Sequence, residues 1–160
     1  MDNMSDDIVY ARTLTSAREF AQRGRIEDWV HAYLLSDGRN KPFSDGLKKC
    51  PRAWFGPMDM PCALFERCCG PEEGMKFRVD ADGFELRVGN LMRAISAGED
   101  MPPLIVNCVL GQLTLNDGNH RFEAMRRLGM ARCNVIVFTT GDEETRWFEE
   151  NADRLRGCQP

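Results

Sequence analysis

The sequence predicts an α/β fold, in the broad sense that includes α+β, for a chain of 160 residues. Short apolar runs typical of strands occur at residues 102–109, 112–115 and 133–138. Segments with apolar side chains at helical spacing lie between and around these runs. Because strands and helices alternate along the second half of the chain, we expect a small mixed sheet with helices around it.

Two helices are expected near the N-terminus, over residues 15–23 and 26–35. The apolar side chains of the second follow the i, i+3, i+4, i+7, i+8 spacing of one helical face: Ile26, Trp29, Val30, Tyr33 and Leu34. Residues 39–61 are rich in Gly and Pro, which predicts a loop with one short strand near 58–61. Residues 1–57 are therefore predicted to form an N-terminal helical extension, packed on a core domain of residues 58–160.

The core domain is expected to begin with a short helical turn at 64–69 and a charged linker at 71–80. A stronger helix is predicted over 84–97, closed by Gly98, with five apolar side chains on one face: Phe84, Val88, Leu91, Met92 and Ile95. The strands follow, and the sequence after Gly141 predicts a final helix to about Leu155.

The charge balance disfavours broad nucleic-acid binding. There are 25 acidic and 21 basic residues, giving a net charge of -4, whereas such binding draws its affinity from a basic face. Three arginines, Arg126, Arg127 and Arg132, form a local basic patch, for which a solvated helix face and a nucleic-acid contact are the two interpretations. No apolar run approaches the roughly 18 residues of a membrane span, and residues 1–7 are acidic rather than signal-like. These features predict a cytoplasmic protein.

The cysteines do not predict a metal site. There are seven of them, no CxxC pair occurs, and the chain has only two histidines. We expect reduced thiols, typical of an intracellular protein. The adjacent pair Cys68–Cys69 is the one candidate for redox chemistry, although a disulfide between neighbouring residues is strained.

The chemistry is expected at the turn Asp117-Gly118-Asn119-His120-Arg121. A strand that ends in a glycine-containing turn and feeds a helix suits an anion, since the first helical amides lack internal partners and the dipole favours negative charge. Gly118 allows close approach of the backbone, and His120 and Arg121 add donors. The alternative is an ordinary Asp-Gly turn whose arginine faces solvent and whose histidine packs nearby.

This turn resembles the signature of the ParB/sulfiredoxin-like superfamily, G-x-x-R-x-x-A, with Gly118, Arg121 and Ala124 at the three fixed positions. The resemblance covers about residues 58–155 and is strongest over 84–138; residues 1–57 have no counterpart. The order of features agrees with it, because a helix ending in Ala94-Ile95-Ser96-Ala97-Gly98 precedes the proline-led strand and the turn.

The resemblance implies a ligand, a nucleoside di- or triphosphate (ATP, ADP or CTP) with Mg²⁺. In sulfiredoxin the turn reads G-C-H-R, so Asn119 stands in place of the nucleophilic cysteine and that chemistry is not expected unless another thiol replaces it. The implied phosphate contacts come from Gly118, Asn119, His120 and Arg121. Alignment on Ile95 adds two residues of the preceding helix, Arg87 and Asn90, for which a solvated polar face is the alternative.

Other members of the superfamily imply catalytic and metal roles. Kinases of free serine have a D-G-H-H-R-like turn, which implies that Asp117 ligates Mg²⁺ or orients a hydroxyl and that His120 is catalytic. The partitioning CTPases carry a later E-N-x-x-R motif, which implies that Glu150 and Asn151 are further metal ligands. Glu72 and Glu73 are candidates for the general base. The alternative is that both residues belong to a solvated loop.

Three functions follow as hypotheses. The first is a nucleotide-dependent phosphotransferase or hydrolase acting on a small-molecule or protein acceptor. The second is a non-enzymatic module that senses a nucleotide. The third is a DNA-associated accessory of the ParB type, which the net charge and the missing DNA-binding and dimerisation domains disfavour.

Four aromatic residues of the extension are read as core, or as one wall of a nucleotide cleft: Trp29, Tyr33, Trp54 and Phe55.

Overall fold

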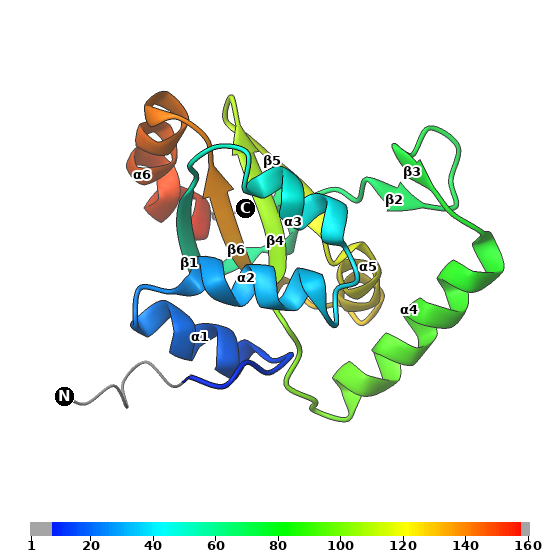
Figure 1. Cartoon of the computed structure of the whole chain (residues 1–160). Coiled ribbons are helices and arrows are strands. Elements are labelled where there is room, and N and C mark those ends of the chain that lie inside the picture. The colour runs from blue at the N-terminus through cyan, green and yellow to red at the C-terminus, as the bar shows by residue number, and fades with distance from the viewer. Residues whose placement is uncertain (1–7, 158–160) are drawn as a thin grey trace.

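The computed structural model describes residues 8–157. The acidic stretch 1–7 and Cys158 lie outside this range. A mixed four-stranded sheet is surrounded by helices, as expected (Figure 1). The strands are β1 (Ala53–Pro61), β4 (Leu104–Val109), β5 (Gln112–Asp117) and β6 (Arg132–Thr139). The helices are α1 (Leu14–Gln22), α2 (Ile26–Leu35), α3 (Lys41–Leu47), α4 (Ala81–Ser96), α5 (Asn119–Arg127) and α6 (Asp142–Arg156).

The order of strands across the sheet is β1-β6-β4-β5. The central pair, β4 and β6, is parallel, and each outer strand is antiparallel to its neighbour. A tight hairpin through Leu110 and Gly111 joins β4 to β5, and both residues have positive φ, as such two-residue turns require. Helix α5 then carries the chain from β5 to β6.

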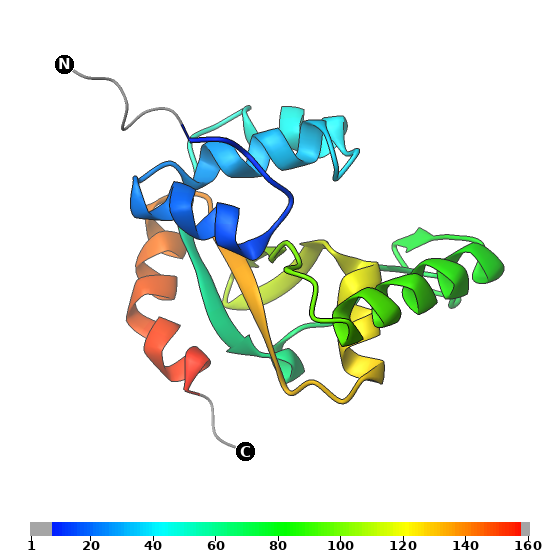
Figure 2. The same ribbon diagram turned by 90° about the horizontal axis from the view of Figure 1, so that it is seen from below.

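The two faces of the sheet are covered by different helices (Figure 2). Ile105 and Ile136 point to one face, where they pack with Ala17, Phe20, Trp29 and Leu34 of α1 and α2. Their neighbours Val106 and Val137 point to the opposite face, where they pack with side chains of α5 and α6, among them Phe122 and Phe148. This alternation is the period of two expected of a strand buried on both faces.

Helix α4 stands apart from the sheet and packs chiefly against α5. Its Phe84 and Val88 are buried against Ala124. Before α4, the chain forms a small parallel ladder of β2 (Cys69–Gly70) and β3 (Phe77–Arg78). Figure 1 shows these strands and α4 as an arm projecting beside the sheet. We call residues 65–98 the arm.

Two predictions for the first half of the chain were wrong. The loop predicted over 39–61 contains α3 and the full strand β1. Asn40 caps α3 by accepting a hydrogen bond from the Phe43 amide at 3.2 Å, and Pro42 suits the first turn. β1 tolerates its Gly and Pro because its register shifts between Phe55 and Met58.

The arm also differs from the prediction. In place of a helical turn at 64–69 there is a 3₁₀ turn over Cys62–Leu64, followed by β2. Part of the predicted linker 71–80 pairs as β3. Helix α4 begins three residues before the predicted start, because the Asp80 carboxylate accepts a hydrogen bond from the Gly83 amide at 2.7 Å and caps the helix there.

Candidate functional site

The turn between β5 and α5 has the backbone that the sequence predicts. Gly118 is the N-cap of α5 and has φ 98°. A Cβ at this position would lie 2.5 Å from Leu104 Cδ2 and 2.9 Å from Arg121 Nη2. Glycine is therefore required at position 118, both by the positive φ and because a Cβ would have no room beneath the turn. The first amides of α5 lie at the end of the helix, where they have no carbonyl partner within the helix.

Arg121 faces into the protein, not toward solvent. Arg121 is 7% exposed. Nη1 donates to the Tyr33 hydroxyl at 2.9 Å, and Nη2 donates to the Pro103 carbonyl at 3.1 Å and to Asp117 Oδ2 at 3.4 Å. The buried Nε has no hydrogen-bond partner in the part of the chain that the structure describes. The guanidinium thus lies directly beneath the turn, so direct bidentate binding of phosphate would require it to leave these partners.

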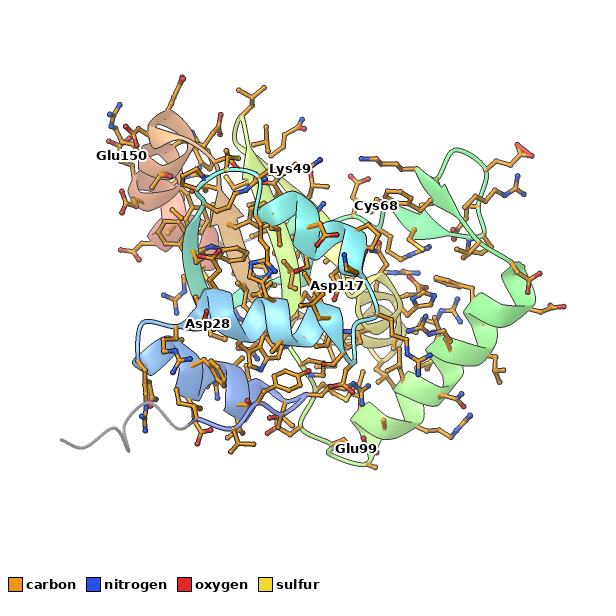
Figure 3. All side chains as sticks on the ribbon, in the orientation of Figure 1. Asp28, Lys49, Cys68, Glu99, Asp117 and Glu150 are labelled. Carbon is orange, nitrogen blue, oxygen red and sulfur yellow. The ribbon has the colours of Figure 1, made fainter. Side chains whose placement is uncertain are left out.

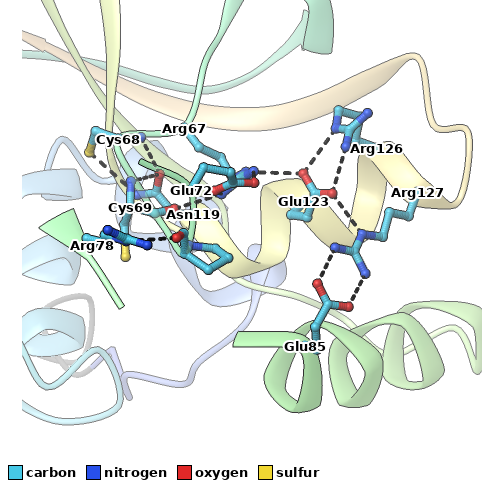
Figure 4. Close-up of polar contacts among 11 residues, drawn as sticks. Arg67, Cys68, Cys69, Glu72, Arg78, Glu85, Asn119, Glu123, Arg126 and Arg127 are labelled. Carbon is cyan, nitrogen blue, oxygen red and sulfur yellow. Dashed lines mark hydrogen bonds and ion pairs between the residues drawn. The ribbon is translucent and has the colours of Figure 1, made fainter. Parts of the chain in front are cut away.

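Asn119 ties the turn to the arm. Its Oδ1 accepts hydrogen bonds from the amides of Cys68 at 2.8 Å and Cys69 at 3.2 Å, and the residue is 6% exposed. Figure 4 shows this contact beside the arm. The side-chain oxygen is therefore used within the fold, and Nδ2 donates to Cys68 Sγ at 3.8 Å.

His120 is a neutral imidazole at physiological pH. Its ring lies 5.0 Å from that of Phe84. Burial, together with the positive charges of Arg87, Arg121 and Arg67, lowers the His120 pKa to about 4. At neutral pH it can donate one hydrogen bond and accept another, but it adds no charge to the site.

A cavity of about 600 Å³ opens onto the turn. This volume is in the range of pockets that hold small-molecule ligands. Four parts of the chain line it: Arg12 before α1, residues 33–43 of α2 and α3 with the connection between them, the arm, and the turn with Asn116 before it. Outside the turn, the lining includes Arg12, Tyr33, Asp37, Asn40, Phe43, Cys68, Cys69, Lys76, Phe77, Arg87 and Leu91.

The cavity carries more positive than negative charge. Arg12, Lys76 and Arg87 line it, and none of these three pairs with a carboxylate among the residues that the structure describes. Of the two carboxylates in the lining, Asp117 pairs with Arg121 and Asp37 accepts a hydrogen bond from Tyr10. A chain of net charge -4 therefore has a local site suited to an anion.

The remaining predicted residues divide into two groups. Arg87 lines the cavity, but Asn90 does not, and its side chain accepts a hydrogen bond from Arg93 instead. Glu150 and Asn151 lie on α6 and do not line the cavity. Figure 3 shows Glu150 well away from Asp117 and Cys68. Asn151 is bonded within that helix, to the Trp147 carbonyl and to Arg154. The structure does not bring Glu150 and Asn151 together with Asp117.

The donor groups do not fit a resident Mg²⁺. Within residues 8–157 no three side chains of His, Cys, Asp or Glu are grouped so that they could hold a metal ion. The one carboxylate at the turn, Asp117, is already paired with Arg121. A metal at this site would have to be carried in by the ligand.

The predicted basic patch is neutralised. The carboxylate of Glu123, 2% exposed, binds Arg67 at 3.1 Å and both Arg126 and Arg127 at 2.7 Å (Figure 4). Arg127 also binds Glu85 of α4, and Arg132 pairs with Asp59. These arginines hold α5, the arm and β1 in place, so the solvated helix face is the better interpretation of the patch. Glu72 is likewise paired, with Arg67.

Sequence reasoning missed most of the cavity lining. Of the four aromatic residues of the extension, Tyr33 lines the cavity, whereas Trp29, Trp54 and Phe55 pack in the core. Lys76 and Phe77 fell in a segment read as linker, and residues 37–43 in one read as a helix end and loop. Their only sequence signal was a cluster of turn-forming and basic residues, which is common in solvated loops.

Comparisons with known proteins bear on the fold. No protein-family model matches the sequence, and no curated protein matches it either. Among solved structures, sulfiredoxin from Arabidopsis thaliana is similar, with 24% identity and a TM-score of 0.41, over 58% of this chain and 94% of that one. A truncated chromosome-partitioning protein ParB from Caulobacter crescentus, complexed with CTP-gamma-S, has 19% identity and a TM-score of 0.43, over 62% of this chain.

A Pnob8-like ParB-N domain is also similar, at 14% identity and a TM-score of 0.42. The chain spans about half the length of the ParB structures, 54% of the first and 40% of the second. These are the protein groups that the turn resembles, and the mixed four-stranded sheet with surrounding helices agrees with the predicted fold class. Because the identities are below 25% and the TM-scores below 0.5, no statement about the activity or ligands of this chain rests on these likenesses.

The helices of residues 8–157 include none with the length and apolar character that crossing a membrane requires. The six cysteines in this range are free thiols.

Proposed function

We propose that this chain binds a nucleoside di- or triphosphate in the cavity, with the phosphates at the N-terminus of α5. One observation carries the proposal: a cavity of about 600 Å³ opens on a glycine-capped helix N-terminus and is lined by three cations, Arg12, Lys76 and Arg87, that have no carboxylate partner within residues 8–157. Helix amides and unpaired cations together are the usual protein groups for phosphate. The ParB structure in complex with CTP-gamma-S makes a nucleotide the natural first class of ligand to test.

The binding test compares two arginines of α4. Arg87 lines the cavity, whereas Arg93 lies about two turns further along the same helix and is outside it. Arg87→Ala and Arg93→Ala remove the same charge from the same helix. Calorimetry with ATP, ADP, CTP and pyrophosphate should show Arg87→Ala binding the best of these ligands ~10-fold more weakly, the scale of one charge-assisted hydrogen bond. Arg93→Ala should bind within about twofold of the wild type, since only its distant charge is lost.

Two results would contradict the proposal. The first is a wild-type protein that binds none of the four probes at millimolar concentration. The second is an equal loss of affinity in Arg87→Ala and Arg93→Ala, which would mean that net charge alone draws the ligand.

A phosphotransferase activity is the second candidate, favoured by the neutral imidazole of His120 beside the turn. A neutral imidazole can accept a proton from a hydroxyl nucleophile, although a pKa of about 4 makes it a weak base. Asp117, the other candidate, is paired with Arg121. His120→Gln should retain nucleotide binding and lower turnover of ATP or CTP, supplied with Mg²⁺, by ~10²-fold or more. Binding without any turnover in the wild type would leave the sensing module as the function.

A further inference from the structure

Tyr33 connects the N-terminal helices to the turn. The residue is 3% exposed, and its ring stacks on that of Trp29 with centroids 5.1 Å apart and planes within 6° of parallel. Its hydroxyl accepts the hydrogen bond from Arg121 Nη1 at 2.9 Å. Arg121 in turn pairs with the Asp117 carboxylate at 3.4 Å. One side chain of the extension therefore contacts the buried cation of the turn.

The other edge of Tyr33 supports a wall of the cavity. The connection between α2 and α3 lies against its ring, so that a Cβ on Gly38 would come within 2.7 Å of Tyr33 Cε2. The Gly38 amide donates to the Tyr33 carbonyl at 2.7 Å, and the Asn40 amide donates to the Leu34 carbonyl at 2.8 Å. Asp37, Gly38 and Asn40 all line the cavity. This wall therefore packs against Tyr33.

The buried guanidinium needs this partner. Arg121 is enclosed beneath Gly118 with its Nε unpaired, so its position depends on the bonds from its two terminal nitrogens. Removal of the Tyr33 hydroxyl would leave a second buried donor without a partner, which is costly for a charged group. The guanidinium would then shift, and with it the Gly118 backbone that rests on it.

We propose that Tyr33 is a positioning residue of the ligand site, which fixes Arg121 beneath the turn and the wall of residues 37–40 opposite it. The N-terminal helices are then part of the site and not merely a cover for the sheet. The proposal rests on the proposed function, because it concerns the same cavity. Tyr33 acts on the phosphate end of the ligand through Arg121 and the turn.

The test is Tyr33→Phe, which keeps the stacked ring and removes only the hydroxyl. Its matched control is Ser44→Ala, which removes a fully buried hydroxyl, bonded to His31 at 2.7 Å, from α3 of the same extension, outside the cavity. Pyrophosphate is the probe, since it contains only the phosphate part of a nucleotide. We expect Tyr33→Phe to lower its affinity ~5- to 10-fold, and Ser44→Ala to leave it unchanged.

A second measurement does not depend on the variant folding. The chain has two tyrosines, Tyr10 and Tyr33, so the fluorine spectrum of protein labelled with 3-fluorotyrosine should show two resonances, which Tyr10→Phe assigns. Saturating pyrophosphate should shift the Tyr33 resonance, because the turn and Arg121 contact its hydroxyl.

The outcomes separate the two proposals. If the wild type does not bind pyrophosphate or nucleotide, the proposed function is wrong. If it binds, and Tyr33→Phe binds equally well or Ser44→Ala loses as much, the role of Tyr33 is wrong. A Tyr33 resonance that stays in place at saturation would overturn that role as well.

Discussion

The side-chain oxygen of Asn119 accepts a hydrogen bond from the Cys68 amide at 2.8 Å, across 51 positions of sequence. This bond fastens the start of the arm to the first turn of α5, which is also the proposed phosphate site. The residue that stands where the resemblance places a nucleophilic cysteine thus has a structural use in this chain.

Asn119→Ala should therefore destabilise the protein and loosen the arm. Two partly buried amides, of Cys68 and Cys69, would lose their acceptor, at a cost of about 1–3 kcal/mol. Thermal unfolding measures the loss, and mass spectrometry after alkylation should show faster labelling of the two thiols. Asn90→Ala, an exposed substitution on α4, is the control and should change neither. Unchanged labelling in Asn119→Ala would contradict the role of this bond.

Gly118→Ala should be destabilising beyond the cost of positive φ alone. Its Cβ would overlap Leu104 and the Arg121 guanidinium, whereas the Cβ of Gly129→Ala, at φ 75°, would meet no atom within 4 Å. We expect Gly129→Ala to cost about 1 kcal/mol and Gly118→Ala about 1–3 kcal/mol more. Chemical denaturation of both variants gives the comparison, and equal losses would show that the space beneath Gly118 is not tight.

The Glu123 carboxylate should make stability depend on acid pH. Burial opposes its ionisation, but the hydrogen bonds from Arg126 and Arg127 outweigh burial and hold the pKa of Glu123 at about 2. A carboxylate whose folded pKa lies below its unfolded value of ~4.3 stabilises the fold above that value. The stabilisation is lost as pH falls toward the folded pKa. The free energy of unfolding should fall between pH 4.5 and 2, and Glu123→Gln should be less stable at pH 7 with a flatter acid limb. If the free energy of unfolding of Glu123→Gln falls with acid as steeply as that of the wild type, other groups cause the pH dependence.

His120 should titrate well below an ordinary histidine. Its imidazole signal in proton NMR should stay that of the neutral form down to about pH 5, with a midpoint near 4. Because the unfolded state takes up its proton near pH 6.5, stability should decrease as pH falls from about 6.5 to 4. A midpoint above 6 would mean that the ring is charged at the site and contributes to anion binding directly.

Random duplex DNA should not bind at physiological salt. The arginines of the predicted patch are paired with Glu123, Glu85 and Asp59. Because the net charge of the chain is also -4, we expect little counterion release on contact with DNA. A gel-shift assay at micromolar protein checks this, with Arg126→Ala as a variant expected to behave like the wild type. Salt-sensitive binding that Arg126→Ala weakens would favour the DNA-associated alternative.

The sequence predicted the periodic elements well. Helix α2 was predicted over its observed range, because five apolar residues define one helical face. Strands β4 and β6 and the turn at Gly118 were also predicted, since apolar runs and an Asp-Gly turn are local signals. By contrast, α3 and β1 were missed. The seven residues of α3 contain both Pro42 and Gly46, and the register of β1 depends on pairing with a strand about 80 positions later.

The site was predicted most completely at the turn from Asp117 to Arg121, which is one stretch of sequence. The cavity also needs Arg87, which the resemblance implied, Tyr33, which was read as core or cleft wall, and Lys76, which was read as linker. The inward direction of Arg121 was not predictable either, because it depends on the hydroxyl of Tyr33 and the carbonyl of Pro103. A short motif indicates which groups are present, and tertiary contacts decide where they point.

Helix α4 packs chiefly on α5, and the ion pair of Arg127 with Glu85 joins the two helices. Glu123 of α5 also pairs with Arg67 of the arm and with Arg127. The arm should therefore open as one unit, at a lower free energy than the sheet. Amide hydrogens of α4 would then exchange with deuterium earlier than those of β4 and β6, and as one group. A ligand bound between the arm and the turn would slow exchange in α4 while leaving the central strands unaffected.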